Sequence, residues 1–593
     1  INELFLHPTT QDHHIPSYPM LGDTTSSSID LSLYSHIPVA LFHGSNSWAV
    51  AGERSASGKP ILCNDTHIGY GMPQVWYEAH LNFGESNIYG NFLPGIPYAL
   101  VAHNDFLAWG LTMFENDDMD FYQETVLDQD HYQYQEEALK IKIREEKISI
   151  KGSDDTTIVV RESHHGPFIE GRIPELSTSN SEITMRWEFL KGDNLLLEAF
   201  REMNYANSMS AFRKGVSKIH SPGLNAVYAD VDNNIAWWAC ARLIQWNENV
   251  NTKAILNGSS GYDDPLGSLP FFLNPNQVNP VNGIVYSANS QSMQPDGELY
   301  PGYYVPESRA ELIKKELLLE TNWSPEDMKK LLLNTMNEVD LTNAFFLEGL
   351  LRESKTPFNT LEQMAMTHLR KWDGNYEVES TGASIYQHLH YNLMRAAFLD
   401  EISEDQFQQM NRLHWMKRVG IELMRNPHHM IWDISGTEEV ETLENALDEA
   451  FQLTVEQFRD LYGPNPENWA WGKIHTLEFN HPMAAGGDLF KRIYNLGPIP
   501  SSGSNETIMQ GGFVPGDLPE YRTHFGPQMR IIIDFSDVQK AWSITPTGQS
   551  ARRWSPHYSD QFELYQNGEF RSMWMTDTVP SSIHKKLHLN PSE

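Results

Sequence analysis

The sequence predicts a mixed fold in which strand-rich regions flank a long, mainly helical segment at about residues 306–463. In the first half, short apolar stretches bounded by turn residues are typical of β-strands. In the middle, apolar residues recur every three or four positions, which is the spacing of one helix face. Strand patterns return at residues 529–535 and 541–546.

The strand candidates begin near residue 45. Residues 47–53 and 60–65 are apolar runs on either side of a turn sequence, SASGKP, and predict a hairpin. Asn233 and Asn234 can adopt the positive φ angles of a second, tight hairpin turn. The other candidates lie at residues 141–150, 156–162 and 182–190. Residues 1–44 have the composition of turns and linkers.

Two helices have recognisable ends. Ser324 is placed to cap a helix that has Pro325 at its first position and Asp327 three residues after the cap. The apolar stripe of this helix is formed by Met328, Leu331, Leu332 and Met336. The second helix carries its stripe at Leu443, Ala446, Leu447, Ala450 and Phe451. Gly463 is the expected end of this second helix.

Composition excludes several classes of protein. Of 593 residues, 40% are hydrophobic and 20% are charged, as in a globular protein. The net charge of −35 argues against nucleic acid and anionic membranes as partners. Two cysteines provide neither a disulfide framework nor a cysteine zinc site, and no apolar run is long enough to span a membrane. Because the sequence begins with Ile1, we expect a removed leader or the later part of a longer precursor.

Several catalytic motifs are missing from the sequence. It contains no HExxH zinc motif, no GxSxG nucleophile elbow, no phosphate-binding glycine loop and no dinucleotide fingerprint. Histidine pairs occur at residues 13–14, 164–165 and 428–429. Because adjacent residues on a strand point to opposite faces, we expect these to be surface or core histidines rather than paired zinc ligands.

An acidic cluster at Asp117, Asp118 and Asp120 has two interpretations. It is either a solvated turn or a site for a hard cation such as calcium, which prefers several oxygen ligands. The sequence DVDNN at residues 230–234 resembles a calcium loop only at its start. Ile235 replaces the loop glycine and Ala241 replaces the bidentate Glu, so a hairpin turn is favoured there.

Ser45 follows Gly44 directly before the first strand candidate. A serine hydroxyl needs a base to act as a nucleophile, and an N-terminal serine carries its own base, an α-amine whose ordinary pKa is about 8. The chain would then have to be cut between Gly44 and Ser45. Taken alone, these residues are more often an ordinary turn.

A longer pattern resembles the β-chain of the penicillin acylase family of N-terminal nucleophile (Ntn) hydrolases. The resemblance rests on GSNSWAVAGERSASGKPILCNDTHIGYGMPQVWYEAHL, AHNDFLAWGLTMFENDDMDFYQE, SHHGPF, NAVYADVDNNIAWWA, GIVYSANSQ, YRTHFGPQMRIIIDFSD, PTGQS and SPHYSDQFELY. It implies an α+β fold, a four-layer αββα sandwich of stacked antiparallel sheets with a helical insertion. Residues 1–44 would be the end of a pro-region, and residues 45–593 the β-chain.

The resemblance implies catalytic roles for five residues. Ser45 matches the nucleophile that self-cleavage exposes, and His67 a residue near its amine, which is Gln in the penicillin G branch. The Asn289 side chain and the Met113 backbone N–H match the donors to the oxyanion. Arg309 matches an arginine near the active site, with a helix-surface arginine as the alternative.

The resemblance also implies a structural calcium ion and no organic cofactor. Its ligands would be the side chains of Asp117 and Asp120 and the carbonyls of Met119 and Ile244, where the family often has proline. A later acidic ligand would be Asp296 or Glu298. For the acyl group of the substrate, the matched pocket positions are Ile68, Leu100, Val101 and Phe114, which any core could also contain.

The implied activity is hydrolysis of the amide of an N-acyl compound, of penicillin, cephalosporin or acyl-homoserine-lactone type, through an acyl-serine intermediate. Export to the periplasm and an α-chain as heterodimer partner are also implied; most of that α-chain is absent from this sequence. One alternative is a homologue that never cuts itself and only binds ligands. Another is a carbohydrate-active enzyme using Asp117 and Asp120, which requires carboxylates facing a groove.

Overall fold

The computed structural model describes residues 44–84, 86–169, 181–292, 297, 299–412, 414–435, 437–516 and 518–575. Of the segment expected to precede the nucleophile, only Gly44 lies within these ranges. Both cysteines, Cys63 and Cys240, are buried and free. Among the described helices, none has both the length and the apolar character needed to cross a bilayer.

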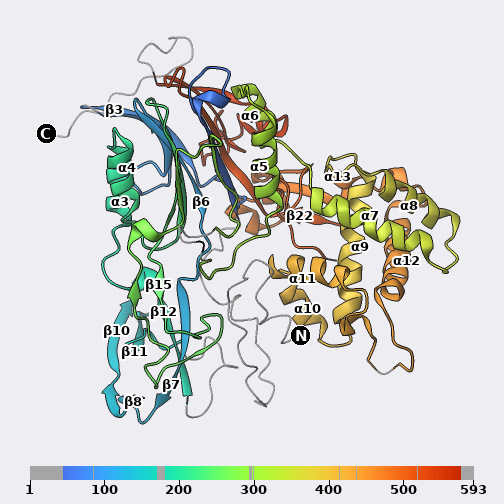
Figure 1. Ribbon diagram of the computed structural model, residues 1–593, viewed down its shortest axis with the longest axis horizontal. Coiled ribbons are helices and arrows are strands. Elements are labelled where there is room, and N and C mark those ends of the chain that lie inside the picture. Colours follow the sequence, from blue (N-terminus) through green and yellow to red (C-terminus); the bar gives the residue numbers. More distant parts are fainter. Residues whose placement is uncertain are drawn as a thin grey trace.

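Two antiparallel sheets form the centre of the molecule (Figure 1). Sheet one has the order β19-β1-β2-β23-β24-β25, with strands Ile284–Ser287, Ser45–Val50, Ile61–Gly69, Phe525–Asp534, Lys540–Ile544 and Arg571–Trp574. Sheet two has the order β18-β14-β13-β6-β5-β4-β3, with strands Asn276–Val278, Ile235–Cys240, Leu224–Asp230, Leu107–Met113, Val101–Asn104, Ser86–Phe92 and Tyr77–Phe83. Strands from both ends of the chain thus meet in sheet one.

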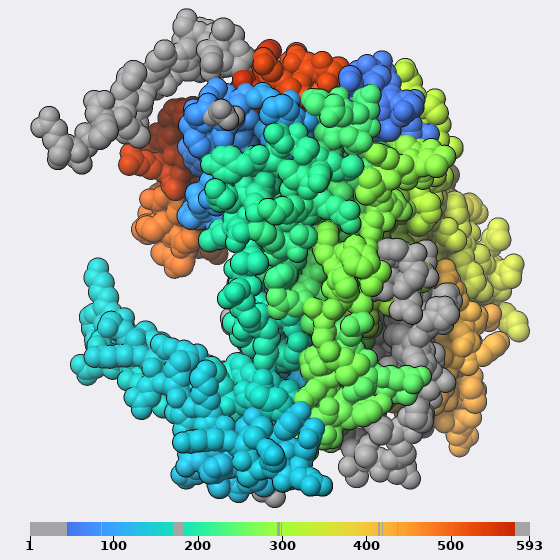
Figure 2. Space-filling model, turned by 60° about the vertical axis from the view of Figure 1, so that its left-hand side comes forward, coloured from blue at the N-terminus to red at the C-terminus, as the bar shows by residue number. Residues whose placement is uncertain are grey.

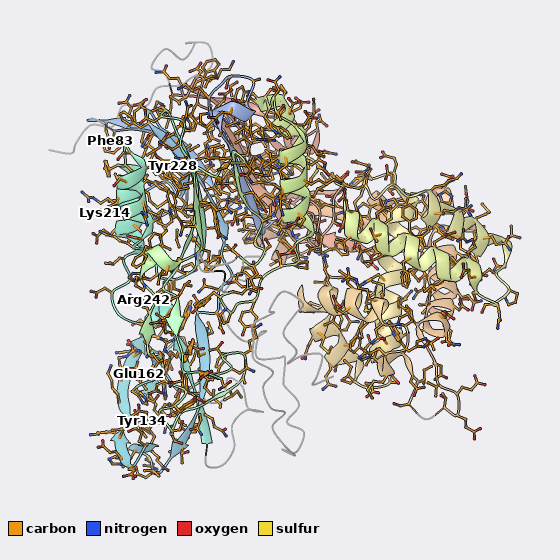
Figure 3. All side chains as sticks on the ribbon, viewed as in Figure 1. Phe83, Tyr134, Glu162, Lys214, Tyr228 and Arg242 are labelled. Carbon is orange, nitrogen blue, oxygen red and sulfur yellow. The ribbon has the colours of Figure 1, made fainter. Side chains whose placement is uncertain are left out.

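Sheet one is covered on both faces. Successive side chains of its strands point to opposite sides, so they enter two different cores. On β1, Ala49 packs in the core shared with sheet two, whereas Trp48 and Val50 pack in the core under helices α5 (Ser308–Leu319) and α6 (Pro325–Leu332). Helices α3 (Leu196–Asn204) and α4 (Met209–Val216) cover sheet two. Figure 3 labels Tyr228 of β13 in this packed region, where its ring lies 5.0 Å from that of Phe212 on α4. The layers run helix, sheet, sheet, helix, which confirms the αββα sandwich.

The predicted helix after Ser324 is present as α6. The Ser324 hydroxyl accepts from the Asp327 N–H, and the Asp327 carboxylate accepts from the Ser324 N–H, so the capping box is complete. The helix ends at Leu332, and Met336 therefore lies beyond it. Of the two asparagines expected in the β13–β14 turn, only Asn233 has a positive φ, at 69°.

The helices of the predicted helical segment pack against two different hydrophobic cores. Helices α5 and α6 belong to the sandwich, whereas α7 to α12 surround a core of their own and project to one side in Figure 1. Their bounds are Glu338–Glu353, Thr360–Lys371, Thr381–Phe398, Glu404–Met410, His414–Arg425 and Leu443–Tyr462. Gly463, with φ 86°, ends α12 as expected.

A smaller sheet extends from the other end of the sandwich. It pairs β12 (Ser181–Trp187), β7 (Met119–Val126), β8 (His131–Tyr134) and β9 (Glu137–Lys140), and β16 (Leu256–Asn257) lies parallel to β7. A two-stranded hairpin of β10 (Lys142–Ile148) and β11 (Thr156–Glu162) accompanies it. In Figure 2 this region, coloured cyan, projects from the body.

Candidate active site

Ser45 is the first residue of β1, a strand paired on both sides inside sheet one. Only 5% of its surface is exposed. Its hydroxyl donates to the carbonyl oxygen of Gly44 at 2.5 Å, so the Oγ atom lies directly beside the peptide bond that self-cleavage would break. The backbone N–H of His67 donates to the same Gly44 oxygen at 3.2 Å and to Ser45 Oγ at 3.3 Å. A donor is therefore already placed where negative charge would develop on that carbonyl.

Gly44 is required at this position for two reasons. Its φ of 130° lies in a region that residues with a side chain rarely adopt. A Cβ atom here would also lie 3.0 Å from Gln510 Oε1 and 3.2 Å from an Arg309 nitrogen. A larger residue here would therefore be strained in its backbone and tightly packed against the ends of these two side chains.

Asn289 contacts both Ser45 and Met113. Its Oδ1 accepts from the Ser45 N–H at 2.7 Å, and its Nδ2 donates to the Met113 carbonyl at 2.9 Å. Its φ is 68°, a left-handed conformation that asparagine tolerates better than most residues. In this uncut chain the amide holds the scissile nitrogen. Its expected role as a donor to an oxyanion belongs to the cleaved enzyme and stays a prediction.

Arg309 is fully buried although it lies on helix α5, so it is not the helix-surface arginine of the alternative interpretation. Its guanidinium donates to the Ser45 carbonyl at 3.1 Å, to Asn46 Oδ1 at 2.7 Å and to Asn289 Oδ1 at 3.1 Å. The Arg309 guanidinium thus links the Ser45 carbonyl with the side chains of Asn46 and Asn289.

The His67 ring lies between Asp65 and Gln510. Its Nε2 is 3.0 Å from Asp65 Oδ2, and its Nδ1 is 2.5 Å from Gln510 Oε1. Burial lowers the pKa of His67, while the Asp65 charge opposes this shift. His67 therefore contacts Ser45 through its backbone N–H, whereas its ring contacts Asp65 and Gln510.

Sequence reasoning missed Asp65, Asn46 and Gln510. Asp65 and His67 share one face of β2, so the period of a strand could have suggested that they lie together. Gln510 is 443 residues from His67, and no local signal indicates that contact.

The four expected acyl-pocket residues lie in one core. Val101 and Phe114 are buried in it, and Ile68 and Leu100 pack against it. A cavity of about 540 Å³ lies elsewhere, between α5, the helical body and the segment before β23. Among the residues lining it are Ser308, His390, Arg412, Lys417, Glu506 and His524. Ser308 lines this cavity and directly precedes Arg309, but neither Ser45 nor Arg309 is among its lining residues.

The expected calcium ligands lie at the start of β7. Asp117 is buried; its Oδ2 accepts from the Thr252 hydroxyl at 2.5 Å, and its Oδ1 has no hydrogen-bond partner. Asp120 is buried and accepts from Arg186 at 3.0 Å. Burial raises the pKa of Asp117 to about 7, and burial together with the Asp117 charge raises that of Asp120.

The donor set at this position fits a hard cation. Two buried carboxylates that repel each other and an oxygen without a partner are features that a bound Ca²⁺ would satisfy. Tyr300 accepts from the Ile244 N–H at 2.7 Å and so anchors the residue expected to offer a carbonyl. Asp296 and Glu298 lie outside the described residues. Since Asp117 and Asp120 are buried, they do not face a groove as a glycosidase pair would.

A buried serine at the head of a strand in an αββα sandwich defines the class of N-terminal nucleophile hydrolases. Residues 3–579 match the family model described as penicillin amidase, and the chain belongs to that family. It is 24% identical to the acyl-homoserine lactone acylase QuiP of Pseudomonas aeruginosa, covering 99% of this chain and 75% of that protein. It is 25% identical to the penicillin acylase 2 proenzyme of a Pseudomonas species, covering 87% and 65%.

A solved structure, the thermostable penicillin G acylase from Alcaligenes faecalis, superimposes with a TM-score of 0.71 at 19% identity. The match covers 92% of this chain and all of the solved chain. At this identity the likeness concerns the fold, and it agrees with the layer order described above.

Proposed function

We propose that this chain cuts itself between Gly44 and Ser45 and then uses Ser45 as an N-terminal nucleophile. The class of reaction follows from the family: the chain is an amide-hydrolysing enzyme of the acylase type. The observation that carries the proposal is the short contact of Ser45 Oγ with the Gly44 carbonyl oxygen, 2.5 Å, at a bond whose carbonyl oxygen also accepts from the His67 N–H and whose nitrogen donates to Asn289.

Self-cleavage proceeds as a shift of the acyl group from nitrogen to oxygen. Ser45 Oγ attacks the Gly44 carbonyl carbon and loses its proton, and the His67 N–H stabilises the oxyanion. The Gly44–Ser45 C–N bond then breaks, and the departing nitrogen takes up a proton. Water hydrolyses the resulting ester, which leaves a carboxylate on Gly44 and a free amine on Ser45.

In turnover, the freed α-amine accepts the Oγ proton, directly or through water, as Ser45 attacks the substrate amide. The Asn289 side chain, no longer holding a peptide nitrogen, turns its Nδ2 to the substrate oxyanion together with the Met113 N–H. Each such donor is typically worth about 10²–10³ in kcat. The leaving amine departs, and water releases the acyl group from Ser45.

The proposed substrates are N-acyl-homoserine lactones, with penicillin-type amides as the alternative. The proposal is supported by a relative of each kind and by His67, since the penicillin G branch has Gln at that position. The acyl chain would lie against Ile68, Leu100, Val101 and Phe114, an apolar set without charged groups.

Three further features belong to the proposal. A structural Ca²⁺ would be held by Asp117, Asp120 and the carbonyls of Met119 and Ile244, which would neutralise the buried carboxylates. A preceding α-chain would remain bound as the partner of the cleaved β-chain. Export to the periplasm would place the enzyme where extracellular N-acyl compounds enter the cell.

The test is to express the full-length precursor and to determine intact masses and N-terminal sequences. We expect a polypeptide that begins Ser-Asn-Ser-Trp, and hydrolysis of N-acyl-homoserine lactones by the purified protein. Ser45→Ala should leave one uncut, inactive chain. Ser47→Ala is the matched control, because Ser47 is two residues away and donates only to the Cys63 carbonyl, at 2.9 Å.

Three other outcomes discriminate between the alternatives. A wild-type chain that folds but stays joined through Gly44 would favour the homologue that only binds ligands. Cleavage followed by hydrolysis of penicillins alone would replace the proposed substrate and leave the nucleophile intact. Cleavage in Ser45→Ala would overturn the mechanism.

A further inference from the structure

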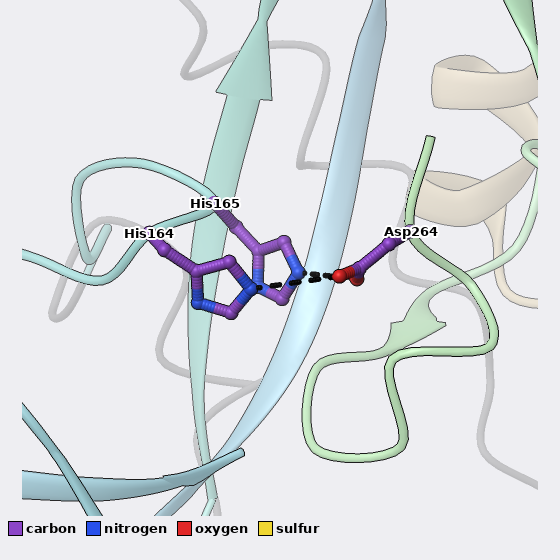
Figure 4. A group of neighbouring side chains, drawn as sticks. All are labelled: His164, His165 and Asp264. Carbon is purple, nitrogen blue, oxygen red and sulfur yellow. Dashed lines mark hydrogen bonds and ion pairs between the residues drawn. The ribbon is translucent and has the colours of Figure 1, made fainter. Parts of the chain in front are cut away.

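A cluster of histidine and carboxylate side chains lies in loops beside the smaller sheet, away from the nucleophile's sheet. His164 and His165 occupy the loop after β11, and Asp264 comes from the turn after β16. Figure 4 shows both rings and the carboxylate converging on one point. One ligand atom from each of the three residues lies within 4.8 Å of the others.

The loop explains why adjacent histidines face the same way. The expectation that they point apart holds for a strand, but β11 ends at Glu162 and the two histidines lie in a bend. Their ring centroids are 3.8 Å apart. The sequence analysis assumed that this histidine pair lies on a strand. That assumption was wrong for His164 and His165, so it does not argue against a metal site here.

His165 is oriented so that Nε2 faces Asp264. Its Nδ1 lies 2.8 Å from Glu124 Oε1, a carboxylate that also accepts from Ser163 and Thr184. A carboxylate oxygen accepts, so Nδ1 donates to Glu124 and Nε2 is the ring nitrogen that faces Asp264. A carboxylate behind a ligand histidine is the usual device that orients it for a metal.

His165 Nε2 faces a second acceptor, Asp264 Oδ1, at 2.9 Å. Two acceptors can face each other only if a proton or a cation lies between them. His164 Nε2 lies 3.8 Å from Asp264 Oδ2, and its Nδ1 lies 2.9 Å from the Tyr132 hydroxyl. Both imidazoles thus aim the same nitrogen at one carboxylate.

The spacing suits a tetrahedral ion. Zn²⁺ ligand bonds of about 2.0–2.2 Å at tetrahedral angles place ligand atoms roughly 3.4 Å apart. The two N···O distances, 2.9 Å and 3.8 Å, lie on either side of this value. The Tyr134 hydroxyl donates to Asp264 Oδ2 at 2.6 Å and steadies the carboxylate; Figure 3 labels Tyr134 at the far end of the smaller sheet.

We propose that His164, His165 and Asp264 bind a divalent transition-metal ion of the zinc class, with water as the fourth ligand. Imidazole and carboxylate together suit Zn²⁺, whereas the all-oxygen site at Asp117 suits Ca²⁺. The ion ties the loop after β11 to the turn after β16, two segments about 100 residues apart, Asp264 being 99 residues after His165. The three ligands lie in loops beside the smaller sheet, whereas Ser45 lies in sheet one.

The test uses the full chain as purified, stripped with a chelator and dialysed against Zn²⁺ in excess Ca²⁺, with zinc measured by mass spectrometry. We expect one Zn²⁺ per chain, and a thermal unfolding midpoint that rises with zinc. His164→Ala should weaken zinc binding by at least about tenfold. His131→Ala should not, and is the matched control, because His131 is an exposed histidine of the same sheet paired with a carboxylate, Asp128.

A second variant guards against misfolding. His164→Cys retains a ligand, so it should still bind the metal, and Co²⁺ should then show a thiolate charge-transfer band that the wild-type chain lacks. A wild-type chain without stoichiometric zinc would overturn the proposal. So would zinc binding that is unchanged in His164→Ala, or that is lost equally in His131→Ala.

Discussion

The side-chain oxygen of Asn289 holds the backbone nitrogen of Ser45 at 2.7 Å, across 244 residues of sequence. The nitrogen in this contact is the one that would be released as the catalytic amine. The same asparagine donates to the Met113 carbonyl, so one side chain joins the nucleophile to the other predicted oxyanion position. Its observed contact is with the scissile bond, and the proposed chemistry gives it a second role on the substrate.

Replacing Asn289 with Ala should lower kcat by about 10²–10³ in whatever fraction of the protein is cleaved, because one oxyanion donor is lost. Steady-state kinetics on N-terminally sequenced protein measures this. Asn225→Ala is the control variant. Asn225 also donates to the Met113 carbonyl, at 2.9 Å, but its other side-chain contacts are with Thr112 and Trp237 rather than with Ser45. Equal losses in the two variants would mean that Asn289 acts only by supporting Met113.

Gly44→Ala should leave the precursor largely uncut. The added Cβ would push against Gln510 and Arg309 at 3.0 Å and 3.2 Å, and the φ of 130° would be strained. A time course of intact masses after refolding measures the cleavage rate. Gly58→Ala is the control, because its φ is also positive, at 71°, but nothing lies within 4 Å of an added Cβ. Rapid cleavage in Gly44→Ala would show that self-cleavage does not depend on a glycine packed against Gln510 and Arg309.

Calcium removal should lower the thermal unfolding midpoint of the precursor. An ion present at about 100 times its dissociation constant stabilises a folded chain by about 2.7 kcal/mol. Scanning calorimetry with and without a calcium chelator measures the effect, and Asp117→Asn should abolish the difference. Asp118→Asn should keep it, because the neighbouring Asp118 accepts from Ser221 and is not among the expected ligands. Calcium dependence that persists in Asp117→Asn contradicts the site.

His475 should make the fold sensitive to mild acid. Burial lowers the pKa of this fully buried histidine to about 4, from an ordinary value of 6.5. Between these values the unfolded chain takes up a proton that the folded chain does not, so the free energy of unfolding falls as the pH falls. The contribution is up to about 1.4 kcal/mol per pH unit.

Denaturant unfolding at pH 7 and pH 5 measures this dependence. His475→Gln should reduce the slope, while its amide can still donate to the Ser501 carbonyl that His475 Nδ1 now contacts at 2.7 Å. An unchanged slope would mean that His475 is not a source of the acid sensitivity.

Where the local patterns of the sequence predicted an individual element, its observed ends lie close to the expected ones. The strand expected at residues 156–162 is β11 without change, and the Ser324 cap and the Gly463 stop are both present. These features depend on residues within one turn or one strand, where periodicity and capping chemistry operate. The family motif around Ser45 likewise lies in one continuous stretch.

Contacts over long separations could not be read in that way. Gln510 reaches His67 across 443 residues, and Arg309 binds the Ser45 carbonyl across 264 residues, which decides between its two expected positions in favour of the active site. Both contacts arise because segments far apart in sequence pack together in the folded chain, and the local sequence around each residue does not show which distant residue it will meet.

The sequence by itself determined several strands, the ends of two helices with their apolar stripes, and the order of the family's motifs, because each depends on neighbours along the chain. The tertiary structure alone decided which polar groups surround the Gly44–Ser45 bond. It also decided that His164 and His165 face Asp264 together, because a bend replaces the strand geometry that would have turned them apart.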